Sequence, residues 1–62
     1  MSDTNKILEA EKNVLAAARA WRVTERNLIA DASQANKSAH HFAKRGLRTA
    51  EDFLAKLYGG EL

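Results

Sequence analysis

The chain contains no cysteine and no proline, and it has only three glycines and four aromatic residues. Without cysteine it forms neither a disulfide nor a thiolate metal site. No apolar run approaches the roughly 20 residues that a membrane-spanning helix needs. The first five residues also lack the charged-then-apolar pattern of a secretory signal peptide. We therefore expect a cytoplasmic protein without a membrane partner.

Catalytic and cofactor-binding patterns are also missing. Serines, a histidine pair and scattered acids are present, but no spacing brings a nucleophile, a base and an orienting group together. His40 and His41 are neighbours, and adjacent helical side chains point about 100° apart, so the two imidazoles do not converge on a metal ion. We expect a non-enzymatic protein that binds no cofactor and no metal.

Helix breakers are absent from residues 1–45, which contain neither glycine nor proline. β-branched residues are scarce, whereas alanine, leucine and the charged helix formers dominate. These features predict an all-α fold. The 62 residues make a single domain near the lower size limit at which one core holds a fold.

A heptad of apolar residues starts at Ile7. Every seventh residue is apolar as far as Phe42, and alanines occupy several of the intermediate positions. This spacing places the stripe on one face of a helix. The stripe is rich in alanine and the chain is short, so one copy buries little area. We therefore expect a homodimer. The heptad residues are Ile7, Val14, Trp21, Leu28, Ala35 and Phe42.

The long helical region is expected to break at Thr24. Its hydroxyl can cap the following helix while Val23 packs on Leu28, an arrangement called a hydrophobic staple. The alternative break is the segment 31–33, because its aspartate or its serine can cap a helix there. The sequence leaves the choice between the two breaks open. It also allows one unbroken helix over about residues 4–45, with the short third helix folded back on it.

A second helix stop is expected at Gly46, which follows two basic residues and suits a left-handed C-terminal cap that brings Leu47 against Phe42. Thr49 then caps a short third helix that ends before Gly59. The prediction is an all-α helical hairpin or three-helix domain. Its two long helices and short C-terminal helix cover about residues 4–22, 25–45 and 50–58, with a flexible tail at 59–62.

Basic residues gather in the second half of the chain. Residues 32–50 contain four Lys and Arg residues and no acid. On a helix, Arg26, Lys37 and Lys44 fall nearly opposite the apolar stripe, with His41 close by. A row of cations can neutralise phosphates. The candidate nucleic-acid-binding residues are Arg26, Lys37, His41, Lys44, Arg45 and Arg48.

Trp21 is the only tryptophan, and arginines flank it. Tryptophan and arginine are enriched where proteins bind one another. The candidate protein-interface residues are Ile7, Val14, Trp21, Arg22, Leu28 and Phe42. We favour a small non-enzymatic regulator or inhibitor that docks on a larger protein. The alternatives are a regulator that binds DNA or RNA through the basic residues and a structural assembly subunit.

Overall fold

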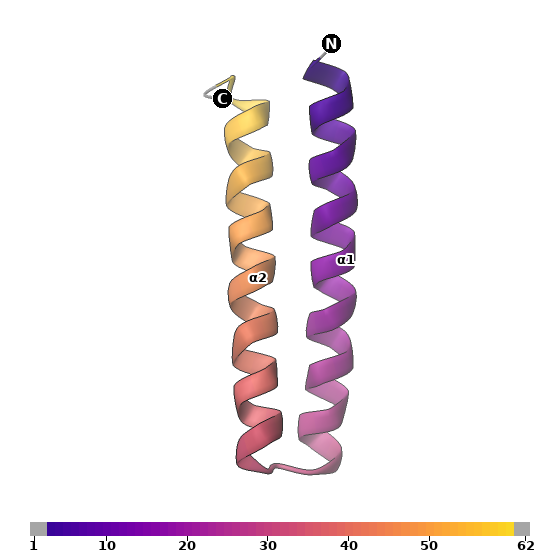
Figure 1. Cartoon of the computed structure of the whole chain (residues 1–62), viewed down its shortest axis with the longest axis vertical. Helices are drawn as coiled ribbons and strands as arrows, with labels where there is room; N and C mark the ends of the chain where they lie inside the picture. The colour runs from indigo at the N-terminus through magenta and orange to yellow at the C-terminus, as the bar shows by residue number, and fades with distance from the viewer. Residues whose placement is uncertain (1–2, 61–62) are drawn as a thin grey trace.

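Two antiparallel helices form the structure, a computed structural model that describes residues 3–60 (Figure 1). Helix α1 spans Asp3–Ala30, helix α2 spans Gln34–Tyr58, and residues 31–33 connect them. The pair is a rod with extents of 45 × 16 × 12 Å. The described residues contain no strand. The prediction of an all-α helical hairpin is confirmed.

A clasp of side-chain hydrogen bonds forms the connection between the helices. Ser33 has an extended backbone, and its hydroxyl accepts a hydrogen bond of 3.2 Å from the amide of Asn36. The side-chain amide of Asn36 donates to the carbonyl oxygens of Asn27 and Asp31, at 3.2 and 2.7 Å. The last carbonyls of a helix lack partners within it. The side chain of Asn36 therefore caps the C-terminal end of α1, and the side chain of Ser33 caps the N-terminal end of α2.

Helix α1 continues through Thr24, so the break predicted there is wrong and the alternative at 31–33 is the one that forms. The Thr24 hydroxyl lies 2.9 Å from the carbonyl oxygen of Ala20 and 3.0 Å from that of Trp21. It bonds back to the preceding turn, which is how threonine is accommodated inside a helix. Val23 is 49% exposed and makes no staple.

Helix α2 continues through Gly46 and Thr49, so the predicted helix stop and the third helix are wrong. Among the described glycines only Gly60 has a positive φ, of 73°. Leu47 and Ala50 are half-buried against α1, and this packing keeps the chain helical across a glycine that costs about 0.5–1 kcal/mol relative to alanine. Phe42 is 70% exposed, so the contact with Leu47 expected for a stop does not form.

The end of α2 at Tyr58 agrees with the predicted end of the last helix. The amide of Gly59 donates to the carbonyl of Ala55 at 3.0 Å, and Gly60 takes the left-handed conformation that commonly follows a helix. Of the flexible tail predicted at 59–62, residues 61–62 lie outside the described residues.

The half-buried residues that face the other helix form the seam of the hairpin. In α1 the heptad from Ile7 keeps its register as far as Leu28. After the connection the register moves by one residue, so Asn36 and Ala43 face α1 where Ala35 and Phe42 were expected. The reason is that a new helix starts at Ser33. The seam of α2 consists of Ser33, Asn36, His40, Ala43, Leu47, Ala50, Leu54 and Leu57.

The seam buries little. Among the side chains of residues 4–60, only Ala10 is buried, with 2% of its surface exposed. Large apolar side chains stay at the surface, and the most exposed of them is Ile29, at 81%. A single hairpin therefore leaves much apolar area exposed to water. Burial of that area would stabilise the fold.

Replacing Ser33 by alanine removes the N-cap of α2. We expect Ser33→Ala to lower the free energy of unfolding by about 1 kcal/mol. Ser38→Ala is the matched control, because Ser38 is exposed inside α2 and alanine is the better helix former. Urea denaturation followed by circular dichroism measures both changes. Equal stability of the two variants would show that Ser33 does not cap the helix.

Candidate functional site

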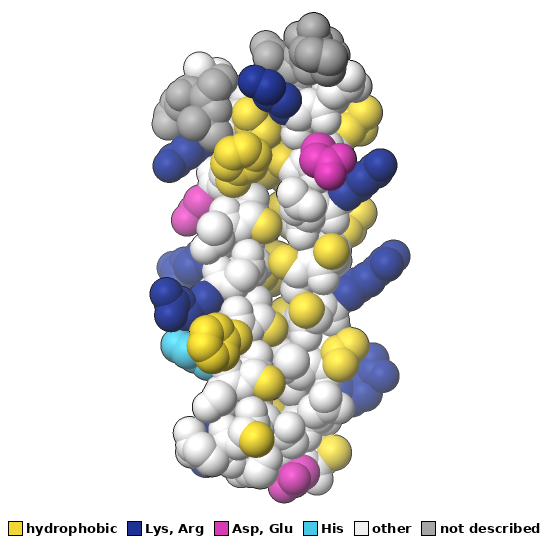
Figure 2. All heavy atoms as spheres, viewed as in Figure 1, with side chains coloured by type: hydrophobic (Ala, Val, Ile, Leu, Met, Phe, Trp, Pro, Cys, Tyr) yellow, Lys and Arg dark blue, Asp and Glu magenta, His cyan; other side chains and the backbone are white. Residues whose placement is uncertain are grey.

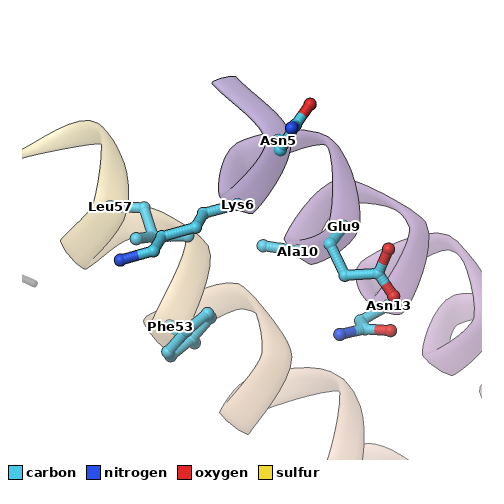
Figure 3. Close-up of a pocket in the computed structure, with 7 residues that line it drawn as sticks. All are labelled: Asn5, Lys6, Glu9, Ala10, Asn13, Phe53 and Leu57. Carbon is cyan, nitrogen blue, oxygen red and sulfur yellow. The ribbon is translucent and has the colours of Figure 1, made fainter. Parts of the chain in front are cut away.

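Two contacts define the two sides of the hairpin. On one side the hydroxyl of Tyr58 donates a hydrogen bond of 2.5 Å to a carboxylate oxygen of Glu11. On the other side Asn13 and Phe53 line an open groove (Figure 3). Residues seven positions apart share a side of a helix in such a pair. These contacts and the heptad spacing assign the residues that flank the seam to one side or the other, and the remaining exposed residues lie on the outer faces of the helices.

The side that carries the Tyr58–Glu11 hydrogen bond is basic, and so is the outer face of α1 that adjoins it. We call the two together the basic side. Lys37 and Lys44 precede Tyr58 at multiples of seven residues. Lys12, Arg19 and Arg26 are seven residues apart and each directly follows a residue of the Glu11 heptad position, so they lie on the adjoining outer face of α1. The exposed cations of this side number seven and come from both helices: Lys12, Arg19, Arg22, Arg26, Lys37, Lys44 and Arg48. Its acids are Glu11, Glu25 and Glu51, and its histidine is His41.

Arg22 is the one cation of the basic side that has an acid partner among the described residues. Its guanidinium lies 3.5 Å from a carboxylate oxygen of Glu25 and 5.5 Å from the ring centre of Trp21. Both contacts are exposed and therefore weak. The other six cations form no ion pair with a described acid. They are available to an anionic ligand.

Trp21 and His40 meet in the seam, in the half of the hairpin nearer the connection, with ring centres 5.5 Å apart. The Nδ1 atom of His40 lies 3.0 Å from the hydroxyl oxygen of Thr24. That hydroxyl has one proton, which it can donate either to a carbonyl of its own helix or to the imidazole. Which of the two groups donates in the contact between His40 and Thr24 depends on the tautomer of the imidazole. Among the described residues no three His, Asp or Glu side chains cluster as metal ligands would.

The structure separates the protein-interface candidates. Four of them, Ile7, Val14, Trp21 and Leu28, lie in the seam and contact α2. Arg22 is on the basic side. Phe42 is 70% exposed on the opposite side. These six residues do not form one surface in the hairpin.

Most of the nucleic-acid candidates, by contrast, lie together. Arg26, Lys37, His41, Lys44 and Arg48 share the basic side, whereas Arg45 is on the outer face of α2. Lys12, Arg19 and Arg22 are not among the predicted residues, because they precede the helix expected to begin near Thr24 and are mixed with acids along the chain. The heptad spacing of Lys12, Arg19 and Arg26 does indicate a row of cations along α1. Only the antiparallel pairing of the helices shows that this row lies beside the cations of α2.

The side opposite the basic side carries no charge over most of its length, and we call it the uncharged side. Figure 2 views this side, with hydrophobic side chains along the middle of the rod and charged ones at its margins and ends. Its uncharged positions are Asn13, Ala16, Ala20, Val23 and Asn27 on α1 and Ala35, Ala39, Phe42, Gly46, Thr49 and Phe53 on α2.

A groove lies at the end of the uncharged side, with a volume of about 630 Å³. Phe53 and Leu57 of α2 form one wall, Ala10 and Asn13 of α1 form the other, and Lys6 extends from α1 across it (Figure 3). The groove is open to solvent and combines no nucleophile with a base. It offers apolar contact area and no visible chemistry.

Comparisons of the chain with protein-family models, curated proteins and solved structures find no match. Neither helix of the described chain combines the length and apolarity required to cross a bilayer. The site must therefore be interpreted from its own geometry.

The hydrogen bond to Glu11 raises the pKa of Tyr58 above the ordinary value of 10.0, because the carboxylate accepts a hydrogen bond from the protonated phenol and repels the phenolate. A raised pKa means that the hydrogen bond stabilises the fold below the ordinary value and is lost as pH rises through the folded pKa.

Tyr58 is the only tyrosine, so tyrosinate absorbance during an alkaline titration reports on it alone. We expect a midpoint above 10.0 in the wild type and a lower midpoint in Glu11→Gln, which keeps the size of the side chain without its charge. Identical midpoints for the two proteins would show that the hydrogen bond does not form.

Proposed function

We propose that the protein binds nucleic acid by contacting phosphates with its basic side. The observation that carries the proposal is the grouping of seven cations from both helices on the basic side of a 45 Å rod, where the flank beside the seam and the adjoining outer face of α1 together contain only three acids. Two of those acids, Glu11 and Glu25, are half-buried at the seam and hydrogen-bond to Tyr58 and Arg22. The cations therefore dominate what a ligand meets.

The arrangement of the cations suits an extended polyanion. Lys12, Arg19 and Arg26 recur every seven residues along α1, which is about 10.5 Å of helix. A duplex presents phosphates continuously along its axis, so a straight row of cations can contact several at once. Four of the seven cations are arginines, whose planar guanidinium binds phosphate through two parallel hydrogen bonds.

Little on the basic side can read base sequence. Leu15 and Ile29 stand between the cations, 62% and 81% exposed, and cannot form hydrogen bonds with base edges. Contacts to phosphates fix the position of a protein on a duplex but carry no sequence information. We therefore expect weak sequence selectivity and strong dependence on salt.

The test compares two double charge reversals that change net charge equally. Lys37→Glu with Lys44→Glu alters the basic side, and Lys6→Glu with Lys56→Glu alters the end of the rod that contains the groove. Each pair takes the net charge from +2 to −2. We expect the first pair to weaken duplex binding at least about tenfold and the second to change it much less. Fluorescence anisotropy with labelled DNA and RNA duplexes measures the binding.

The salt dependence gives a second measurement. If all seven cations contact phosphates, the logarithm of the binding constant falls with the logarithm of salt concentration with a slope of about −6 on a DNA duplex. The Lys37 and Lys44 reversal should make that slope shallower by about 2. Equal losses in the two double variants would mean that net charge alone drives binding. No binding at low salt would refute the proposal.

A larger protein is the second candidate partner. The observation in its favour is Phe42, which is 70% exposed on the uncharged side and packs on nothing in the seam. Binding of that kind would depend little on salt and would be lost in Phe42→Ala while the Lys37 and Lys44 reversal retained it. The two functions are therefore separated by which variant loses its partner.

A further inference from the structure

The uncharged side lacks a partner within the chain. It exposes Phe42 at 70%, Phe53 at 47% and Val23 at 49% of their surfaces. We propose that the uncharged side of a second copy of this chain covers it, so that two hairpins pack as a four-helix bundle.

The exposed area of the hairpin matches what a dimer interface needs. The chain exposes 4848 Å², whereas a compact monomer of 6.9 kDa exposes about 4,000 Å². The excess is about 850 Å². A stable protein–protein interface buries about 800 Å² on each partner. Burying that area against one further copy would leave each chain with about the exposed area of a compact monomer of its own size.

The charge pattern favours a second copy as the occupant. Charged residues make up 29% of the chain, yet the stretch of the uncharged side from Asn13 on α1 to Phe53 on α2 contains none. A symmetric dimer brings the same surface together from both copies. Like charges would face one another across such an interface, and the absence of charge removes that repulsion. The basic side cannot pair in this way, because its cations would meet cations.

Gly46 gives an independent reason for close packing on this side. It lies inside α2, where glycine is a poor helix former, and it does not have the positive φ that would require glycine. A methyl group added at Gly46 would meet nothing within 4 Å in the single chain. The hairpin itself therefore gives no reason for glycine at position 46. The close approach of a helix from another copy would give such a reason, because glycine has no side chain to hold the two backbones apart.

The shapes of the two helices are complementary across such an interface. Phe42 and Phe53 project from α2, while the facing positions of α1 are small, with Ala16 and Ala20 in the middle. The phenyl rings of one copy can therefore pack on the alanines of the other, where small residues leave room for large ones. This arrangement would bury the exposed aromatics in the interface.

Sedimentation equilibrium of the wild type tests the association. We expect a mass of twice 6.9 kDa at micromolar concentration. Phe42→Glu and Ala20→Glu each place a charge on the uncharged side and should weaken the dimer at least about tenfold. Ser38→Glu, which places the same charge on the outer face of α2, is the matched control and should leave the dimer intact. A wild type that stays monomeric into the millimolar range would overturn the proposal.

Isotope-filtered NMR of mixed labelled and unlabelled wild type locates the interface without any substitution. We expect contacts between the ring of Phe42 in one copy and alanine methyl groups of α1 in the other. Contacts between copies that instead involve Leu15 and Ile29 would place the interface on the basic side and overturn the proposal. A dimer that Ser38→Glu weakens as much as Phe42→Glu would also overturn it.

The proposed dimer does not depend on the proposed function, so a negative result for one proposal leaves the other standing. A protein that binds no duplex can still have twice the monomer mass, and a monomer can still bind duplex through the basic side. If both proposals hold, the bundle presents its two basic sides outward in opposite directions. It then carries two separate sites for phosphate.

Discussion

The hydrogen bonds that Asn36 donates to the end of α1 fix where α2 begins, and both sides of the molecule depend on that starting point. A register one residue earlier would turn Phe42 into the seam. Lys37 and Lys44 would then rotate to the outer face of α2, away from the arginines of α1. The basic side and the uncharged side exist together because the clasp selects one register.

Local sequence predicted those parts of the fold that local interactions decide. The absence of breakers gave the helical class, and the heptad from Ile7 identified the face of α1 that packs on α2. The prediction of a helix break at Thr24 was wrong because a threonine hydroxyl can donate to a preceding carbonyl as readily as it accepts from a following amide. The stop at Gly46 failed because packing of Leu47 on α1 outweighs the poor helix propensity of glycine.

The candidate site was predictable only in part, because its residues lie on two helices that meet through the fold. Lys37 and Lys44 stand in an acid-free segment that the sequence displays directly. The cations of α1 are mixed with glutamates along the chain, and the helix separates them: Glu25 faces the seam while Arg26 faces outward. The charge of a side becomes visible only once the register between the helices is known.

The position of Trp21 gives the hairpin a built-in optical probe. It is the only tryptophan of the chain, and its ring faces His40 of the opposite helix across 5.5 Å. Separation of the helices would replace that imidazole by water, so the indole emission changes when the hairpin opens. The opening rate of the native protein can therefore be followed without any attached dye.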